Sequence, residues 1–212
     1  MIKILLPSLL VLNSLLLNAQ GPEEAEKLLN EVSTTIASFE NMSFDFTYIL
    51  ENRTENIRQE TNGSAVLSDD RYKINFLGNE QIFDGNTTYT IVPENEEVTI
   101  SNSEEDADFG INPKELLVFY KSGYAYQWDI RQNIKGRRIQ FVKLIPSKEN
   151  KDLKYLLLGI DMRTKIIYRL IEVGKGDTRT TLTLKNIKTN IQLAADLFTF
   201  NASKYPDYYI NN

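Results

Sequence analysis

The sequence contains neither cysteine nor histidine among its 212 residues. Without cysteine there are no disulfide bonds, no thiol catalysis and no thiolate metal sites. Without histidine the chain lacks the usual general base at neutral pH and the commonest transition-metal ligand. Most common enzyme mechanisms are thereby excluded, so we expect a protein with no catalytic residue, no metal and no cofactor.

Basic residues are scarce, with 24 Lys and Arg against 29 Asp and Glu. Lys3 is the only charged residue before Gln20, and the chain from Gln20 onward has a net charge of −6. Nucleic-acid binding requires a positive surface, so we expect no nucleic-acid partner. The acidic clusters at 94–97 and 104–108 lack the spacing of a calcium loop, and we interpret them as solvated loops.

Residues 1–19 have the pattern of a secretory signal peptide, with Lys3 before an apolar run and the small Ala19 at its end. The run is too short and too interrupted for a membrane span. We therefore expect a signal peptide over 1–19 and one exported domain over 20–212. Export without disulfides is typical of the bacterial envelope, so the expected location is the periplasm, and the expected state is a monomer.

Apolar residues at helical spacing predict two helices. The first begins at Pro22, which suits a first helical position, and continues to about Phe39. The second begins at Pro113, ends before Gly123 and has about eight to ten residues. Each helix has an apolar stripe that must pack against another surface.

Elsewhere apolar and polar residues alternate with period two, which predicts about eleven or twelve strands. The expected strands are 42–50, 58–68, 71–77, 80–83, 87–92, 97–101, 126–132, 137–145, 154–160, 165–173, 178–187 and 197–200. Short connections, such as the hairpin signal Asp84-Gly85, make sequential strands antiparallel. The expected sheet is therefore an antiparallel meander.

The alternation assigns one apolar face to this sheet. In the first half, the predicted face consists of Phe44, Phe46, Tyr48, Tyr72, Ile74, Phe76, Tyr89, Ile91, Val98 and Ile100. In the second half, it consists of Ile139, Phe141, Ile145, Leu156, Leu158, Ile160, Leu182 and Leu184. The fold class is mainly β. Either the sheet closes around a packed core, or it forms a half-barrel in which helices act as a lid over a cavity.

The order of several short motifs resembles the LolA family of periplasmic outer-membrane lipoprotein carriers. The motifs are G-x-A-x-L from Gly63, R-Y-K-I-N-F from Arg71, I-F-D-G from Ile82, Y-T-I-V-P-E from Tyr89 and D-L-F-T-F-N from Asp196. The resemblance covers the whole chain after the signal peptide. It implies an unclosed antiparallel half-barrel of about eleven strands, with helices covering a concave apolar face.

The resemblance also implies a function. Members of the family are chaperones that receive acylated lipoproteins from an inner-membrane ATP-driven exporter and deliver them to the outer membrane. The chain departs from the family at one place, where Asp69-Asp70-Arg71 replaces an Arg-Pro pair. The sequence leaves open whether Arg71 takes over the role of the family's lid-closing arginine.

A carrier of this kind must shield acyl chains, because each methylene exposed to water costs ~0.8 kcal/mol. We expect the acyl-binding cavity to be lined by Phe44, Phe46, Tyr48, Ile74, Phe76, Tyr89, Ile91, Leu116, Leu117 and Phe119. Two alternatives stay open on the sequence alone: a structural β-barrel of the outer membrane, and a lipid-binding sensor on the same half-barrel scaffold.

Overall fold

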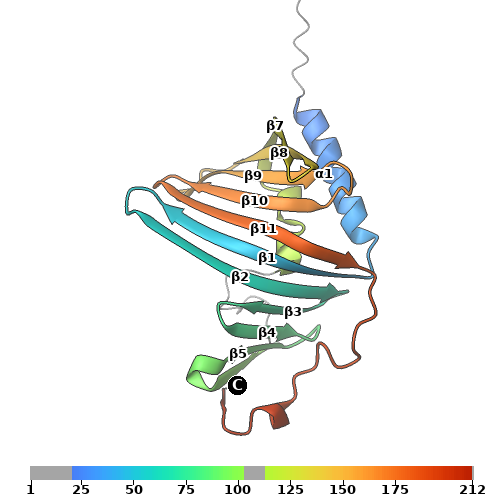
Figure 1. Ribbon diagram of the computed structural model, residues 1–212, viewed down its shortest axis with the longest axis vertical. Coiled ribbons are helices and arrows are strands. Elements are labelled where there is room, and N and C mark those ends of the chain that lie inside the picture. The colour runs from blue at the N-terminus through green and yellow to red at the C-terminus, as the bar shows by residue number, and fades with distance from the viewer. Residues whose placement is uncertain (1–20, 103–112, 212) are drawn as a thin grey trace, which may run out of the picture.

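The computed structural model describes residues 21–102 and 113–211, and the expected signal peptide lies outside these ranges. In the described residues, no helix has both the length and the apolar character needed to cross a membrane. One 12-stranded sheet dominates the structure (Figure 1). The strands are β1 (Asn41–Asn52), β2 (Ile57–Ser68), β3 (Arg71–Phe76), β4 (Asn79–Phe83), β5 (Thr88–Val92), β6 (Glu97–Ser101), β7 (Tyr124–Ile134), β8 (Arg137–Pro146), β9 (Leu153–Asp161), β10 (Ile167–Gly174), β11 (Thr178–Thr189) and β12 (Tyr209–Asn211).

The sheet consists of two antiparallel meanders that join at β1 and β11. The strand order is β12-β6-β5-β4-β3-β2-β1-β11-β10-β9-β8-β7. β1 pairs with β2 on one side and with β11 on the other, so it lies at the middle of the sheet. β7 and β12 occupy opposite ends of the order, and the sheet is not closed. The prediction of a mainly β, unclosed half-barrel with helical cover is confirmed.

The helices are α1 (Pro22–Ala37) and α2 (Pro113–Leu116), with single 3₁₀ turns at η1 (Pro93–Asn95), η2 (Phe119–Lys121) and η3 (Ala202–Lys204). The second predicted helix is wrong in length. After α2 the backbone hydrogen bonds are of the 3₁₀ type, between residues three apart. Val118 N donates to the carbonyl of Glu115 (2.9 Å), and Lys121 N donates to that of Val118 (3.0 Å). β-Branched and aromatic residues at 118–120 have low helix propensity, which accounts for the early end.

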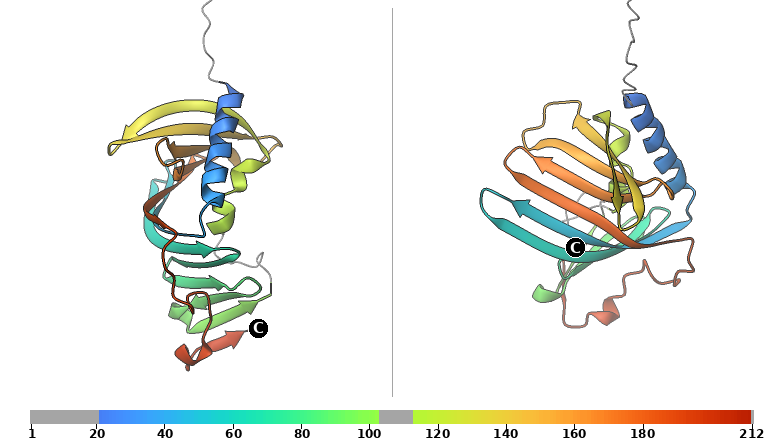
Figure 2. Two further views of the ribbon diagram at one scale, coloured as in Figure 1. Left: turned by 90° about the vertical axis from the view of Figure 1, so that its right-hand side faces the viewer. Right: turned by 45° about the horizontal axis from the view of Figure 1, so that its top comes forward.

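The predicted strand at 197–200 is also wrong. These residues lie in turns, with backbone bonds from Leu197 N to Ala194 O and from Thr199 N to Asp196 O. The last strand is β12, which pairs with β6 in parallel and so departs from the expected all-antiparallel meander. The C-terminal segment, which we define as residues 190–211, therefore crosses back over the sheet to reach the far edge of β6 (Figures 1 and 2).

The sheet buries apolar residues on both faces. We call the face that carries Phe46 the inner face, and the opposite face the outer face. The inner core combines side chains of β1–β4 and β7–β11 with those of both helices. The outer core lies between β4–β6 and the C-terminal segment, and contains Ile82, Ile91, Val98 and Phe198. A smaller outer cluster contains Ile139, Phe141, Tyr168 and Ile171.

The single apolar face expected from the sequence is therefore wrong for β5 and β6. Phe76 pairs with Asn79, which directs Gln81 and Phe83 to the inner face and Ile82 to the outer face. Because Ile82 pairs with Tyr89, and Glu80 with Ile91, both predicted cavity residues of β5 lie on the outer face. Tyr89 and Ile91 belong to the outer core. Val98 and Ile100 follow them, since they pair with Ile91 and Tyr89.

The predicted orientation of β8 is also wrong, and its pairing with β9 shows this. Val142 pairs with Leu158 and Leu144 with Leu156, so Val142 and Leu144 face inward. Ile139 and Phe141 face outward, where the Phe141 ring lies against Gly159. A Cβ at Gly159 would lie 2.8 Å from that ring, so glycine makes this contact possible.

Candidate functional site

α1 forms the first part of a lid on the inner face. Pro22 stands at the first helical position, and Glu23 and Glu24 lie in the first turn, where acidic residues complement the helix dipole. One side of the helix is buried in the inner core, through Ala25, Leu28, Leu29 and Val32. α1 packs along β7, at the open edge of the sheet (Figure 2).

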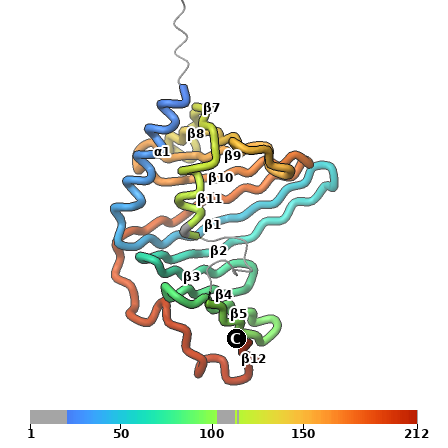
Figure 3. Tube along the Cα trace, turned by 180° about the vertical axis from the view of Figure 1, so that it is seen from behind, coloured from blue at the N-terminus to red at the C-terminus, as the bar shows by residue number. Residues whose placement is uncertain are grey.

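The second part of the lid is the segment from α2 to η2. α2 contacts β2 and β3, so the segment lies over the opposite side of the inner face from β7. Seen from behind, this segment and α1 lie in front of the sheet (Figure 3). Leu117 and Tyr120 are buried in the inner core, with Leu116 and Phe119 partly buried against it. The Phe119 ring meets those of Tyr120 and Tyr124 edge-on.

The floor beneath the lid contains a chain of aromatic rings. The ring centroids of Phe44 and Phe46 are 6.4 Å apart, those of Phe46 and Phe76 are 5.4 Å apart, and those of Tyr48 and Phe76 are 5.4 Å apart. These separations are typical of favourable aromatic pairs. Phe44, Phe46 and Phe76 are buried, whereas Tyr48 is only half-buried. The floor is thus least covered at Tyr48, towards the tips of β1 and β2.

The structure brings eight of the ten predicted cavity residues into one cluster, the inner core. These are Phe44, Phe46, Tyr48, Ile74, Phe76, Leu116, Leu117 and Phe119. Their contact with acyl chains stays a prediction. Sequence reasoning missed the inward residues of β7 and β8, namely Tyr124, Tyr126, Trp128, Val142 and Leu144. Lys143, a charged residue between Val142 and Leu144, was the available signal for their orientation.

The two parts of the lid are joined by uncharged hydrogen bonds. The Ser33 Oγ of α1 and the Tyr120 Oη of η2 are 3.0 Å apart. Tyr126 Oη in β7 donates to the backbone carbonyl of Tyr120 at 2.8 Å. Tyr120 is only 1% exposed. Burial raises the pKa of its phenol, and the hydrogen bond with Ser33 opposes that shift. Tyr120 is therefore protonated at neutral pH and holds both parts together.

A further contact ties α1 to the turn between β9 and β10. Lys165 Nζ lies 2.7 Å from Glu31 Oε2, and both side chains are partly exposed. Exposed ion pairs of this kind contribute little, about 0–1 kcal/mol. The lid is thus held mainly by apolar packing and by the Ser33–Tyr120–Tyr126 hydrogen bonds.

Among the described residues, Arg71 has its contacts away from this lid. It pairs with Ser68 at the end of β3, next to Tyr72, which belongs to the inner core. Because neighbouring residues of a strand point to opposite faces, Arg71 points outward. Its guanidinium lies 5.1 Å from the centroid of the Phe198 ring in the C-terminal segment. Arg71 thus contacts the C-terminal segment on the outer face.

The inner face is filled by the protein's own side chains. Three hollows adjoin the lid. One of about 190 Å³ lies between the end of α1, β1, β2 and Leu117, and one of about 450 Å³ lies beside Ser33, Tyr120 and Tyr126. The third, of about 630 Å³, lies along the polar side of α1 next to Lys165. Because both α1 and the α2–η2 segment bury side chains in the inner core, we describe the lid in this structure as closed.

These features define a class: an unclosed half-barrel whose apolar inner face is sequestered beneath a helical lid. Residues 71–201 match the family described as outer membrane lipoprotein carrier protein LolA. The match covers more than half of the chain, and the chain belongs to the LolA family. No match to a curated protein was found.

Solved structures share the fold at low sequence identity. A conserved protein of Thermus thermophilus is 10% identical with a TM-score of 0.56, over 88% of this chain and 98% of that chain. LprF of Mycobacterium bovis is 12% identical with a TM-score of 0.51, over 82% and 96% of the two chains. MucB is 14% identical with a TM-score of 0.51, over 85% of this chain and 64% of MucB. At these identities the similarity concerns the fold alone.

Proposed function

We propose that the protein is a periplasmic chaperone that binds the acyl chains of lipoproteins on its inner face. It receives them from an inner-membrane ATP-driven exporter and carries them towards the outer membrane as a monomer. One observation carries the proposal: in the described residues, a continuous apolar inner core is covered on one side by two lid elements, α1 and the α2–η2 segment. The protein acts in this proposal as a binding protein and not as an enzyme.

Acyl chains are suitable replacements for the lid side chains. Leu28, Leu29 and Val32 of α1 are buried on the inner face and present the same aliphatic surface that an acyl chain has. Exchanging one for the other keeps the floor out of water. Each buried methylene of the cargo adds ~0.8 kcal/mol, and this gain offsets the apolar packing and the few hydrogen bonds that close the lid.

The location is tested by fractionation of cells that produce the full chain. We expect osmotic shock to release the protein, with an N-terminus near Gln20. Recovery in the membrane pellet after a high-salt wash would contradict a freely diffusing carrier.

Binding is tested with two substitutions at neighbouring positions of the lid. Leu117 is 5% exposed within the inner core, whereas Val118 is 41% exposed. In Leu117→Asp a carboxylate must lie against acyl chains, which is strongly unfavourable. We expect Leu117→Asp to weaken displacement of a fluorescent fatty-acid probe by at least about tenfold, and Val118→Asp to leave it unchanged.

The same pair of variants is then compared in release of acylated lipoprotein from inner-membrane vesicles. The carrier hypothesis requires a lower rate with Leu117→Asp than with Val118→Asp. Equal rates for both variants, or no binding of the probe by the wild-type protein, would overturn it.

A further inference from the structure

β2 has a free edge over half of its length. β2 covers Ile57–Ser68, but β3 pairs only with the part from Gly63 to Ser68. Within the described ranges, no strand pairs with residues 57–62 on the side away from β1. Figure 1 shows β2 extending well beyond β3. Alternate backbone N–H and C=O groups of this stretch point away from β1 and are open to a further strand.

A hollow of about 560 Å³ opens where β3 ends beside this edge. Its lining combines apolar residues, namely Phe46, Phe76 and Leu77, with the amides and hydroxyl of Asn62, Ser64, Asn75, Asn79 and Asn186 and with the charged Asp45 and Lys185. The amides and the hydroxyl can donate and accept hydrogen bonds. Because Asp45 and Lys185 have opposite charges, the hollow has no net charge and suits an uncharged segment of chain.

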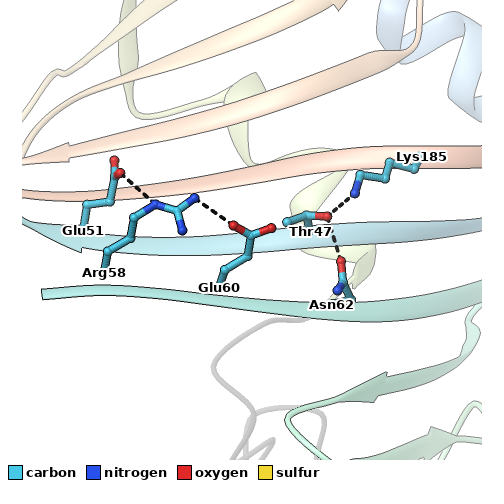
Figure 4. A network of polar contacts seen from close by, with 6 residues as sticks. All are labelled: Thr47, Glu51, Arg58, Glu60, Asn62 and Lys185. Carbon is cyan, nitrogen blue, oxygen red and sulfur yellow. Dashed lines mark hydrogen bonds and ion pairs between the residues drawn. The ribbon is translucent and has the colours of Figure 1, made fainter.

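Side chains of three strands contact one another along this edge (Figure 4). Thr47 in β1 accepts a hydrogen bond from Lys185 in β11 and donates one of 2.8 Å to Asn62 in β2. Towards the tip of the hairpin, Arg58 lies 3.4 Å from Glu51 and 2.7 Å from Glu60. Because residues 57–62 are already paired with β1, their backbone loses little conformational freedom when it binds a further strand.

The free edge adjoins the least covered part of the inner face. Thr61 pairs with Tyr48, so the two share the inner side of the sheet. The Tyr48 ring contacts that of Phe76, which also lines the hollow. A molecule with its apolar part on the aromatic floor at Tyr48 and Phe76 would therefore have its polar part next to the edge of β2.

We propose that the free edge of β2 binds, by strand addition, the extended peptide that follows the acylated N-terminal residue of a cargo lipoprotein. This inference rests on the proposed function and extends it from the lipid to the polypeptide. Backbone hydrogen bonds at the edge hold any sequence, and the hollow, which has no net charge, favours small, uncharged residues. The lipid anchor keeps the peptide at high effective concentration, so a few hydrogen bonds suffice.

The proposal is tested with three synthetic probes that share one lipid. The first is a diacylated cysteine with a tail of about eight Ser, Gly, Asn and Thr residues, ~26 Å long when extended. In the second, alternate amides of the tail are N-methylated. The third has no tail. We expect the first probe to bind about tenfold more tightly than the other two, because only its tail can form the backbone hydrogen bonds.

A cross-linking experiment locates the tail. The chain has no cysteine, so Gln59→Cys provides a single thiol on the free edge. Arg138→Cys is the matched control, because Arg138 is exposed on β8, which has β7 on one side and β9 on the other. With a second, free cysteine in the tail and an added thiol oxidant that takes up the two electrons, we expect disulfide formation at Gln59→Cys and none at Arg138→Cys.

The results distinguish strand addition at β2 from the proposed binding of acyl chains. If the N-methylated or tail-less probe binds as tightly as the first, or if both cysteine variants cross-link equally, strand addition at β2 is overturned while acyl binding stands. If none of the three probes binds, acyl binding itself fails, and this inference fails with it.

Discussion

The Ser33 hydroxyl of α1 lies 3.0 Å from the Tyr120 hydroxyl of η2, and this hydrogen bond joins the two parts of the lid. Tyr126 holds the backbone of Tyr120 from the opposite side, through a 2.8 Å hydrogen bond to its carbonyl. The closure is thus uncharged where the two lid elements meet. Separating the two parts breaks this hydrogen bond and exposes Tyr120 together with the apolar residues around it.

Removing either hydroxyl should weaken the closed lid. In Ser33→Ala the phenol of Tyr120 loses its partner while it stays buried, and we expect a loss of about 1–2 kcal/mol in the free energy of unfolding. In Tyr120→Phe the half-buried Ser33 hydroxyl can turn to water, and we expect a loss below about 1 kcal/mol. Urea unfolding measures both, and stopped-flow binding of a fatty-acid probe should be faster in both variants.

Glu31→Gln is the control on the same helix. Its ion pair with Lys165 is partly exposed, so we expect a change below about 1 kcal/mol that disappears at high salt. The effect of Ser33→Ala should not depend on salt. A salt-dependent effect of Ser33→Ala, or unchanged probe kinetics, would show that this hydrogen bond does not control the lid.

Alkaline pH should destabilise the closed lid. Burial raises the pKa of Tyr120, and it is also the main cause of the raised pKa values of Tyr124 and Tyr126. A phenol whose pKa rises on folding favours the protonated, folded form. Its contribution is complete below the unfolded-state pKa of ~10 and is lost as pH rises through the folded-state value.

We therefore expect the free energy of unfolding to fall above about pH 10, and to fall less steeply in Tyr120→Phe. Urea unfolding at a series of pH values from neutral to strongly alkaline gives both slopes. Identical slopes for the wild type and Tyr120→Phe would assign the alkaline loss to groups outside the lid.

Gly63 should not tolerate a side chain. A Cβ at this position would lie 2.6 Å from Cε2 of Phe46 and 2.7 Å from the backbone carbonyl oxygen of Asn75. Because one of the two is backbone, the clash cannot be relieved by a side-chain rotation alone. We expect Gly63→Ala to cost about 1–3 kcal/mol in urea unfolding. Gly176→Ala, which meets no atom within 4 Å, is the control and should be near neutral; equal effects at both glycines would contradict the packing of Phe46.

Arg71 should affect the C-terminal segment and not the lid. Its guanidinium stacks on Phe198, an exposed contact of ~0.5–1 kcal/mol. We expect Arg71→Ala to increase hydrogen exchange and proteolysis in the C-terminal segment, and Arg71→Lys to have a smaller effect. Probe-binding kinetics should equal those of the wild type, and faster binding would mean that Arg71 does act on the lid.

The sequence predicted the inner face well where the outer side of a strand is polar. In β1, Phe44 and Phe46 alternate with Asp45 and Thr47, and both phenylalanines lie in the inner core. The alternation in β5 is equally regular, but the prediction that Tyr89 and Ile91 face inward is wrong. Tyr89 and Ile91 pack outward because the distant Phe198 and Phe200 cover that face, and period two separates two faces without saying which one is covered.

The inward threonines of β5 show why the error could not be avoided from the strand alone. Thr88 and Thr90 are buried although they are polar. The hydroxyl of Thr90 is satisfied inside the protein, because Gln81 donates to it at 3.2 Å and in turn accepts from Tyr72 at 3.3 Å. That network is visible only once β3, β4 and β5 are paired. The lid shows the same limit, because the apolar residues around Leu117 predicted burial correctly but not the 3₁₀ conformation that follows α2.

The outer core has a consequence for the lid-open state. Ile82, Ile91 and Val98 are packed by the C-terminal segment from the side opposite the lid, so β4–β6 owe little of their burial to α1. We therefore expect β5, β6 and the C-terminal segment to keep their packing when the lid opens, and to show the same hydrogen-exchange protection with and without bound cargo. This part of the sheet would then be a fixed reference against which the lid moves.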